Sequence, residues 1–307
     1  MKIIRSTDFQ LNNDTAVAIG KFDGIHRGHR ELLDRIIAKK AEGLEASVFT
    51  FDKAPMELFG GKMIPSLTTM EEKIRIFEYL SIDNLIIYPL TLESAAIAPE
   101  DYITKILCKQ MRMKYIAAGD DLSFGDKGRG DANLLKQYSE NFDIDIVSKL
   151  VIDGEEVSSS LIRDIVSKGD MEKASKFIGV PYAVSGVVSH GRKLGRTIGF
   201  PTVNIIVPKE KLMPPFGVYF ASVSIEGRHF LGIANIGNKP TVNNLNTVFA
   251  ETHIFDFDED VYGKRITVKL LKFVRSEKKF SSVDELKEQI SVDIKYGREY
   301  FAENIII

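Results

Sequence analysis

The stretch that decides the fold of the first half reads Val17-Ala-Ile-Gly-Lys-Phe-Asp-Gly-Ile-His-Arg-Gly-His-Arg-Glu-Leu-Leu33. An apolar run ends at Gly20, and a tight turn holds Phe22-Asp-Gly24. From His29 onward apolar residues recur every three or four positions, which predicts a helix. A strand, a glycine turn and a helix in this order point backbone N–H groups and a helix N-terminus at a phosphate. We therefore predict a phosphate site here, where His26 and His29 can each donate a hydrogen bond.

Residues 1–150 alternate strand-like and helix-like segments. The expected strands are Thr15–Gly20, Ala46–Phe51, Asn84–Tyr88, Tyr115–Gly119 and Ile144–Leu150, and the expected helices span 29–42, 69–80, 99–112 and 131–140. This alternation predicts an α/β domain with a Rossmann-like, doubly wound parallel sheet, whose ligands bind beyond the carboxyl ends of the strands. No G-x-G-x-x-G follows a strand, so a nicotinamide-dependent oxidoreductase is not supported.

After Pro181 the hydrophobic period changes from 3.6 to 2. Short β-rich runs follow at Tyr182–Val188, Thr202–Val207, Gly217–Ile225, Phe230–Asn235, Thr247–Phe255 and Arg265–Phe273, with a hairpin turn at Glu226-Gly227 and a helix that a capping box opens at Ser282–Glu285. Such spacing predicts a small six-stranded β-barrel with a C-terminal helix. We expect two domains, 1–180 and 181–307.

Composition limits the function classes. The chain has 307 residues, a net charge of −2, 44% hydrophobic residues and one cysteine, Cys108. The charge argues against a nucleic-acid partner, and the single cysteine excludes an internal disulfide or a Cys-rich zinc site. No apolar run approaches membrane-spanning length, so we expect no membrane partner and a cytoplasmic protein. A homo-oligomer stays open.

The residues Gly20-x-Phe-Asp-Gly-x-His-x-Gly-His29 resemble the HxGH nucleotidyltransferase superfamily, and most of all the N-terminal half of bacterial bifunctional riboflavin kinase/FAD synthetases. The resemblance implies that the histidines steady the transition state of adenylyl transfer. It implies an ATP site made of Gly20, Phe22, Asp23, Gly24, His26 and His29. On spacing alone, a metal-binding or solvent-exposed histidine pair is the alternative.

Two later segments extend this resemblance. Val157-Ser-Ser-Ser-Leu-Ile-Arg163 resembles the superfamily's Ile-Ser-Ser-Thr-x-Ile-Arg motif. The match implies that Ser159, Ser160 and Arg163 hold ATP phosphates, with Arg163 opposite the histidines; a capped surface helix is the plain alternative.

The loop Ala118–Asp131 resembles the synthetases' Gly-x-Asp-Phe-x-Phe-Gly loop, which implies that Asp120, Asp121 and Phe124 bind FMN. A mobile acidic surface loop is the other interpretation. Lys21, Ala54, Leu122 and Ser123 depart from the family pattern, and each departure could weaken binding in this half.

In the second half, Gly186–Asn204 resembles the riboflavin kinase signature Gly-Arg-x-x-Gly-Phe-Pro-Thr-x-Asn. The resemblance implies an ATP site at Gly191, Lys193, Gly195, Arg196, Thr202 and Asn204. It also implies that Thr202 and Asn204 hold Mg²⁺, an ion that prefers such hard oxygen ligands. A glycine-rich basic hairpin without this role is the alternative.

The kinase resemblance assigns further residues downstream. Glu251, on a strand face with Phe249, His253 and Phe255, matches the glutamate that takes the proton from the ribityl 5′-hydroxyl; a surface glutamate is the alternative. Asn235 and Arg275 match the flavin side of that site. Acidic residues at 256 and 258–260 look like a metal cluster, but a solvated turn is the favoured interpretation.

These observations predict a bifunctional enzyme that phosphorylates riboflavin to FMN in the barrel and adenylylates FMN to FAD in the first domain, with Mg²⁺ and ATP. The alternatives are a riboflavin kinase whose adenylyltransferase half is slow or inactive, and a non-catalytic regulator that binds flavin or nucleotide.

Overall fold

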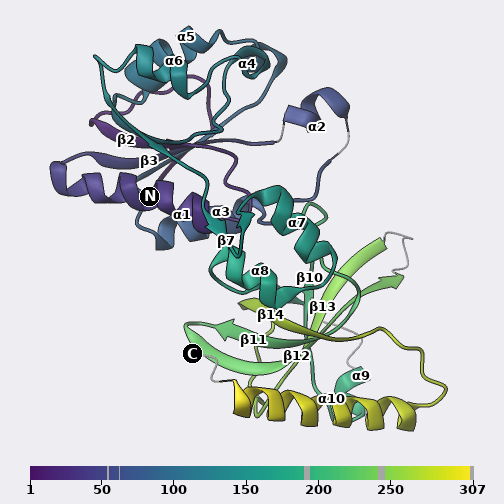
Figure 1. Cartoon of the computed structure of the whole chain (residues 1–307). Coiled ribbons are helices and arrows are strands. Elements are labelled where there is room, and N and C mark those ends of the chain that lie inside the picture. The colour runs from purple at the N-terminus through teal and green to yellow at the C-terminus, as the bar shows by residue number, and fades with distance from the viewer. Residues whose placement is uncertain (54, 62, 190–193, 241–245, 305–307) are drawn as a thin grey trace. The chain divides into compact units, whose positions relative to one another are not determined.

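The computed structural model describes residues 1–53, 55–61, 63–189, 194–240 and 246–304 (Figure 1). The chain divides into two compact units, Met1–Ser159 and Ser160–Ile307. Among the described residues, no helix is both long and apolar enough to cross a membrane.

The first unit is built on a parallel sheet of six strands, in the order β1-β4-β3-β2-β5-β6. The strands are β1 (Lys2–Ile4), β2 (Thr15–Ile19), β3 (Glu45–Phe51), β4 (Asn84–Tyr88), β5 (Met113–Gly119) and β6 (Asp143–Val147). From β2 the chain builds β3 and β4 on one side, and then β5 and β6 on the other. The predicted doubly wound sheet is therefore confirmed, with its switch point between β2 and β5.

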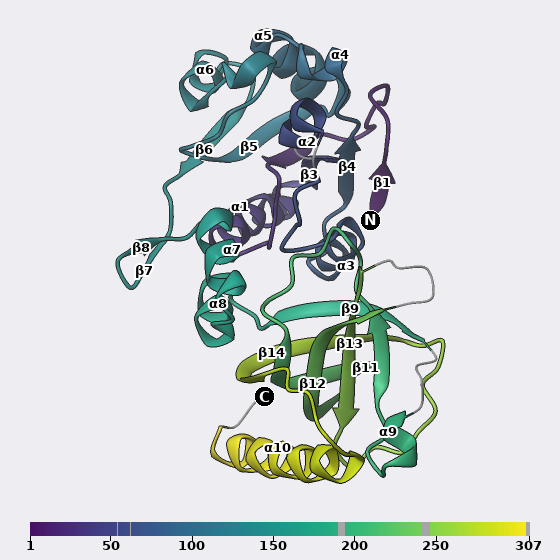
Figure 2. The ribbon, with the colours of Figure 1, turned by 90° about the vertical axis from the view of Figure 1, so that its right-hand side faces the viewer.

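Helices cover both faces of this sheet (Figures 1 and 2). They are α1 (Arg27–Ala38), the 3₁₀ turn η1 (Lys39–Glu42), α2 (Pro55–Gly60), α3 (Met70–Tyr79), α4 (Leu92–Ala95), α5 (Pro99–Asp101), the π-helix η2 (Tyr102–Gln110), the 3₁₀ turn η3 (Asp126–Gly128) and α6 (Ala132–Gln137). Leu33, Ile36 and Phe77 of α1 and α3 pack on one face, and residues of η2 and α6 pack on the other. A short hairpin, β7 (Val151–Ile152) and β8 (Glu155–Glu156), follows.

The sequence did not predict β1, α2, α4 or the β7–β8 hairpin. These elements are two to six residues long. Segments this short have too few residues for a hydrophobic period to be recognised in the sequence. The helix expected over 99–112 begins as α5 and continues as the π-helix η2, which ends at Gln110.

The second unit contains a closed barrel in the order β10-β13-β12-β11-β14-β9 (Figure 2). Its strands are β9 (Tyr182–Ser189), β10 (Val203–Ile206), β11 (Gly217–Ile225), β12 (Arg228–Pro240), β13 (Asn246–Ile254) and β14 (Arg265–Ser276). The predicted six-stranded barrel is confirmed. Glu226 and Gly227 have φ angles of 48° and 81° and join β11 to β12, as a two-residue hairpin turn requires.

The remaining helices of this unit are α7 (Ser159–Ser167), α8 (Met171–Ile178), α9 (Leu194–Thr197) and α10 (Val283–Glu303). Helix α8 packs against β14 and β9. Residues 160–180 thus belong to the barrel's unit by their contacts, and the functional boundary near residue 181 stays a prediction. Ser282 caps α10 as expected, but the Glu285 carboxylate accepts from Ser281 rather than from the cap residue.

Candidate functional site

The turn between β2 and α1 has an unusual backbone. Gly24 has a φ of 86°, and the non-glycine residues Phe22 and Ile25 have φ angles of 47° and 38°. A positive φ is costly for a bulky or β-branched residue, and it persists only where the surroundings enforce it. Phe22 is fully buried against Phe77 of α3, so packing supplies that enforcement.

The two histidines at the start of α1 form a stacked pair. Their ring centroids lie 3.7 Å apart, and the Nδ1 of His26 accepts the backbone N–H of His29 at 3.3 Å. An accepting Nδ1 carries no proton, so neutral His26 bears its proton on Nε2, where it can act as a donor. His26 is also the N-cap of α1, which explains its place at the end of the turn.

Burial keeps both imidazoles neutral near pH 7. It lowers the pKa of His26 to about 4, although Asp23 and Asp121 oppose the shift. It also lowers the pKa of His29 well below the usual value, and the nearby His26 and Lys73 add to that effect. In the described chain, the buried Nδ1 of His29 has no hydrogen-bond partner. A pair of neutral N–H donors at a helix N-terminus suits phosphate oxygens.

The other residues predicted for this ATP site divide between the two units. Within the first, the Ser159 hydroxyl donates to the carbonyl of Asp23 at 2.9 Å and so supports the turn. Ser160 and Arg163 lie on α7 in the second unit. Their approach to the histidines stays a prediction.

The loop after β5 presents the residues predicted to bind FMN. Asp120 and Asp121 are exposed, and Asp121 lies 3.5 Å from Lys149. Phe124 is buried instead: its ring packs 5.2 Å from that of Tyr102, and Gly130 leaves room for it. The Tyr102 hydroxyl is buried with no partner among the described residues, and the sequence did not single this residue out. Leu122 packs beside the same cluster, and Ala54 lies outside the described residues.

In the barrel, the strand register places predicted residues in one transverse row. Asn204 of β10 pairs with Glu251 of β13, which pairs with Asn235 of β12. Asn235 pairs with Val218, and Val218 pairs with Arg275 of β14. Directly paired residues project to the same face of a sheet, so four residues from distant motifs share one face.

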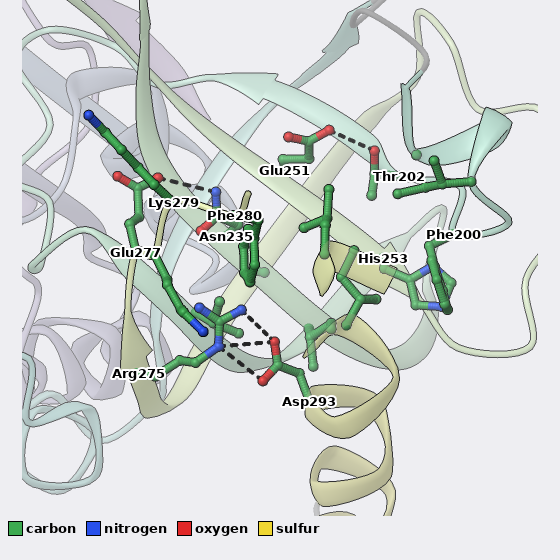
Figure 3. Close-up of a pocket in the computed structure, with 18 residues that line it drawn as sticks. Phe200, Thr202, Asn235, Glu251, His253, Arg275, Glu277, Lys279, Phe280 and Asp293 are labelled. Carbon is green, nitrogen blue, oxygen red and sulfur yellow. Dashed lines mark hydrogen bonds and ion pairs between the residues drawn. The ribbon is translucent and has the colours of Figure 1, made fainter. Parts of the chain in front are cut away.

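Beside this row lies a cavity of about 630 Å³ between the barrel strands and α10 (Figure 3). Polar and charged residues of the lining are Thr202, Asn235, Glu251, His253, Arg275, Glu277, Lys278, Lys279 and Asp293, and the rest of the wall is apolar. Apolar lining members are Ile198, Phe200, Val218, Ile233, Phe280, Leu286 and Ile290. A mostly apolar cavity with a few convergent polar groups is typical of a small-molecule site.

Glu251 and Thr202 face each other at this cavity (Figure 3), and the Thr202 hydroxyl donates to the carboxylate at 2.9 Å. Asn204, two residues on, shares the face of Thr202. Its Oδ1 is buried and, in the part of the chain that is described, accepts no hydrogen bond. A hydroxyl whose lone pairs are available and an orphaned amide oxygen are ligands that fit Mg²⁺.

Gly195, which is also predicted for the ATP site of the barrel, lies in a closely packed part of the backbone. Gly195 lies so close to the carbonyl of Phe200 that a Cβ would approach it to 2.3 Å, so only glycine fits. Gly191 and Lys193 lie outside the described residues, as does the side chain of Arg196.

Arg275 is tied to α10. Its Nε donates to Asp293 at 3.0 Å and its Nη2 at 2.7 Å (Figure 3), and Gln289 donates to the same carboxylate. Asp293 is 2% exposed. The sequence missed this residue because it looks like any polar position of an amphipathic helix. Asn235 contacts the Glu277 carboxylate at 3.4 Å.

The acidic residues after β13 are engaged with arginines. Asp256 makes two hydrogen bonds to Arg298, and Glu259 makes two to Arg228. Across the described residues, no group of three or more His, Cys, Asp or Glu side chains is placed to hold a metal ion. The solvated-turn interpretation agrees with these contacts.

Comparisons with known proteins match the two halves of the chain to two different family models. The FAD synthetase family model matches residues 8–161, and the riboflavin kinase model matches residues 178–301. The bifunctional riboflavin kinase/FMN adenylyltransferase of Escherichia coli K12 is 37% identical over 290 residues, which cover 93% of this chain and 92% of the relative. The enzyme of the same name from Listeria monocytogenes is 33% identical and covers 97% and 96%.

Among solved structures, one described as a macrolide-efflux protein from Streptococcus pneumoniae superposes with a TM-score of 0.85 at 31% identity. It covers 97% of this chain and 99% of its own. On the strength of the two family models and of these full-length relatives, the chain belongs to the family of bifunctional riboflavin kinase/FMN adenylyltransferases, with an FAD synthetase domain followed by a riboflavin kinase domain.

Proposed function

We propose that Glu251 is the general base of the kinase half. It takes the proton of the ribityl 5′-hydroxyl as that oxygen attacks the γ-phosphorus of ATP; the new P–O bond forms, the bond to the β,γ-bridging oxygen breaks, and ADP leaves. This role is supported by the Thr202–Glu251 hydrogen bond in the lining of a cavity that combines apolar and charged side chains.

Thr202 and Asn204 would hold Mg²⁺, which supplies positive charge to the ATP phosphates. The orphaned Oδ1 of Asn204 supports this role. Because the Thr202 hydrogen is committed to Glu251, its oxygen lone pairs stay free to coordinate. Gly195, Lys193 and Arg196 would bind the phosphates, and Asn235 and Arg275 would lie on the flavin side.

For the adenylyltransferase half, we propose that the FMN phosphate attacks the α-phosphorus of ATP and that pyrophosphate leaves. The neutral His26 and His29 would donate hydrogen bonds to the phosphate oxygens, and Arg163 would add positive charge. The stacked pair at the N-terminus of α1, with His26 buried and His29 partly buried, supports this role. FMN would lie near Asp120, Asp121 and the Phe124–Tyr102 pair.

Both reactions use small molecules, and we place them in the cytoplasm without a nucleic-acid or membrane partner. The net charge of −2 supports the absence of a nucleic-acid partner.

The test is a time-resolved product analysis of the full-length protein with riboflavin, ATP and Mg²⁺. FMN should appear first and FAD should follow. FMN that accumulates without FAD would show that the departures at Lys21, Ala54, Leu122 and Ser123 have silenced the first half. Absence of both products would favour a protein that only binds flavin or nucleotide.

A further inference from the structure

The segment that leads into β10 carries Thr202 just ahead of the barrel's hydrogen-bond ladder. Strand β10 begins at Val203, which pairs with Thr252 of β13. Proline has no backbone N–H, so Pro201 cannot donate a hydrogen bond that would extend the ladder past Thr202. The position of Thr202 relative to Glu251 therefore depends on side-chain contacts made by this segment.

His253 of β13 supplies one of these contacts. Its Nδ1 lies 2.8 Å from the carbonyl oxygen of Pro201. A carbonyl oxygen can only accept a hydrogen bond, so Nδ1 is the donor, and a neutral His253 bears its proton there. This is the opposite tautomer to that of His26. The ring also lies 6.0 Å, centroid to centroid, from each of the rings of Phe200 and Phe255.

Glu251 and His253 act on the same peptide segment from one strand. Side chains two positions apart on a strand project to the same face. From that face Glu251 accepts the Thr202 hydroxyl at 2.9 Å (Figure 3), and His253 donates to the carbonyl one residue earlier. That carbonyl belongs to the peptide group that joins Pro201 to Thr202. Because a peptide group is planar, holding its oxygen also fixes the direction in which the Thr202 backbone leaves it.

The turn before Pro201 is closed by contacts of a different kind. The backbone N–H of Phe200 donates to the carbonyl of Gly195 at 2.8 Å, and these two residues are closely packed. Such bonds fix the shape of the turn, since both partners belong to it. The contacts of His253 and Glu251 instead tie the turn to the barrel wall.

We propose that His253 is a positioning residue of the kinase site, whose Nδ1–H donor holds the peptide group before Thr202 so that the Thr202 side chain meets Glu251. The inference rests on the proposed roles of Glu251 and Thr202 in riboflavin phosphorylation. Loss of the donor would let the segment shift, and a misplacement on the order of 1 Å can lower a rate by about 10²-fold.

The test compares His253→Asn with His253→Leu in the full-length protein. The two replacements have similar shapes, but the amide N–H of asparagine can take the place of the Nδ1–H donor, whereas leucine has no donor. His229→Leu is the matched control, since His229 is exposed and contacts Ser224 beside the β11–β12 turn. FMN formation from riboflavin gives kcat and KM for each protein, and thermal melts identify any variant that does not fold.

We expect His253→Leu to lower kcat for FMN formation about tenfold or more. His253→Asn should recover most of that loss, and His229→Leu should match the wild type. Equal losses in the asparagine and leucine variants would overturn the proposal, because a ring that only packs against its neighbours is missed equally in both. A wild-type kcat in His253→Leu would overturn it as well.

Nitrogen NMR of the imidazole rings tests the same proposal without any turnover. The neutral ring of His253 should carry its proton on Nδ1, with its signals assigned by their disappearance in His253→Asn. A proton on Nε2 would overturn the proposal, even if a variant failed to fold. Failure of the wild-type protein to form FMN would contradict the proposed function instead, and it would leave the tautomer measurement unaffected.

Discussion

At the scale of single residues, the chemistry of each half depends on hydrogen-bond direction. The Thr202 hydroxyl donates to Glu251, so the carboxylate acts as a hydrogen-bond acceptor, as the proposed general base must. In the first half, His26 accepts at Nδ1 and must therefore donate from Nε2. Glu251 is thus an acceptor, as its proposed role in proton removal requires. His26 is a donor, as its proposed role in phosphate binding requires.

Replacement of Glu251 separates the two activities. Glu251→Gln keeps the size of the side chain but removes its basicity, so FMN formation should fall about 10²-fold or more. FAD formation from supplied FMN should continue at the wild-type rate. Glu259→Gln is the control, since Glu259 pairs with Arg228 at the surface. Both rates are read by chromatography, and unchanged FMN production in Glu251→Gln would show that another group is the base.

The depressed pKa of His26 makes stability depend on pH. The folded pKa is about 4, below the unfolded value of 6.5. Stability is therefore fully present above about pH 6.5 and is lost as the pH falls toward 4, because the unfolded state binds the proton first. The loss should be on the order of 3 kcal/mol.

This prediction is checked by urea unfolding across that pH range. His26→Asn retains a good N-cap but no titrating group, so its stability should fall less steeply than that of the wild type. Equal slopes for the two proteins would contradict a buried neutral His26.

At the scale of elements, α10 completes the wall of the kinase cavity, and buried contacts hold it in place. Asp293 pairs with Arg275 of β14, and Phe301 and Tyr300 pack on Phe220. A Cβ atom added at Gly297 would lie 3.1–3.5 Å from side chains of the barrel. The absence of a side chain at this position therefore lets the helix approach the barrel closely. The side of the cavity that Arg275 lines thus depends on how this one helix docks.

Asp293→Asn should weaken that docking. It leaves Arg275 without its anionic partner at a 2% exposed position, which should cost roughly 3 kcal/mol of stability. Riboflavin affinity should fall together with the stability of the barrel. Glu288→Gln, at an exposed position of the same helix, should change neither quantity in denaturant melts and flavin titrations. Equal stability of Asp293→Asn and the wild type would mean that the ion pair does not secure α10.

At the scale of the whole molecule, one chain carries two units with separate cores and separate chemistry. The barrel and the parallel sheet each bury their own apolar residues. Variants in the barrel should therefore spare FAD formation, and variants around the parallel sheet should spare FMN formation. Arg163 is the exception, since it lies in the second unit but is assigned to the adenylyltransferase site.

Removal of Mg²⁺ should stop catalysis without unfolding the protein. Excess chelator should abolish FMN formation, since Thr202 and Asn204 are neutral and by themselves supply no positive charge to the ATP phosphates. Circular dichroism should stay unchanged, because the described residues include no metal cluster on which the fold depends. Restored Mg²⁺ should restore activity, and FMN production that persists in chelator would contradict the assigned metal site.

Local patterns in the sequence determined most of the fold. Strands β4 and β11 match the predicted bounds, because each is a run rich in apolar residues between clear turn residues. The same patterns indicated the phosphate turn at His26 and the barrel with its C-terminal helix. The motif matches then identified both activities, which the family models and relatives bear out.

Only the tertiary structure decided how these parts meet. The row Asn204–Glu251–Asn235 depends on strand register, and register is set by pairing between segments far apart in the chain. The buried Asp293 and Lys73 have no local signature, since a polar residue on a helix looks the same whether its partner is water or another element. Local sequence therefore determined which elements form and which chemistry they carry. Long-range packing decided which side chains are buried, paired and charged.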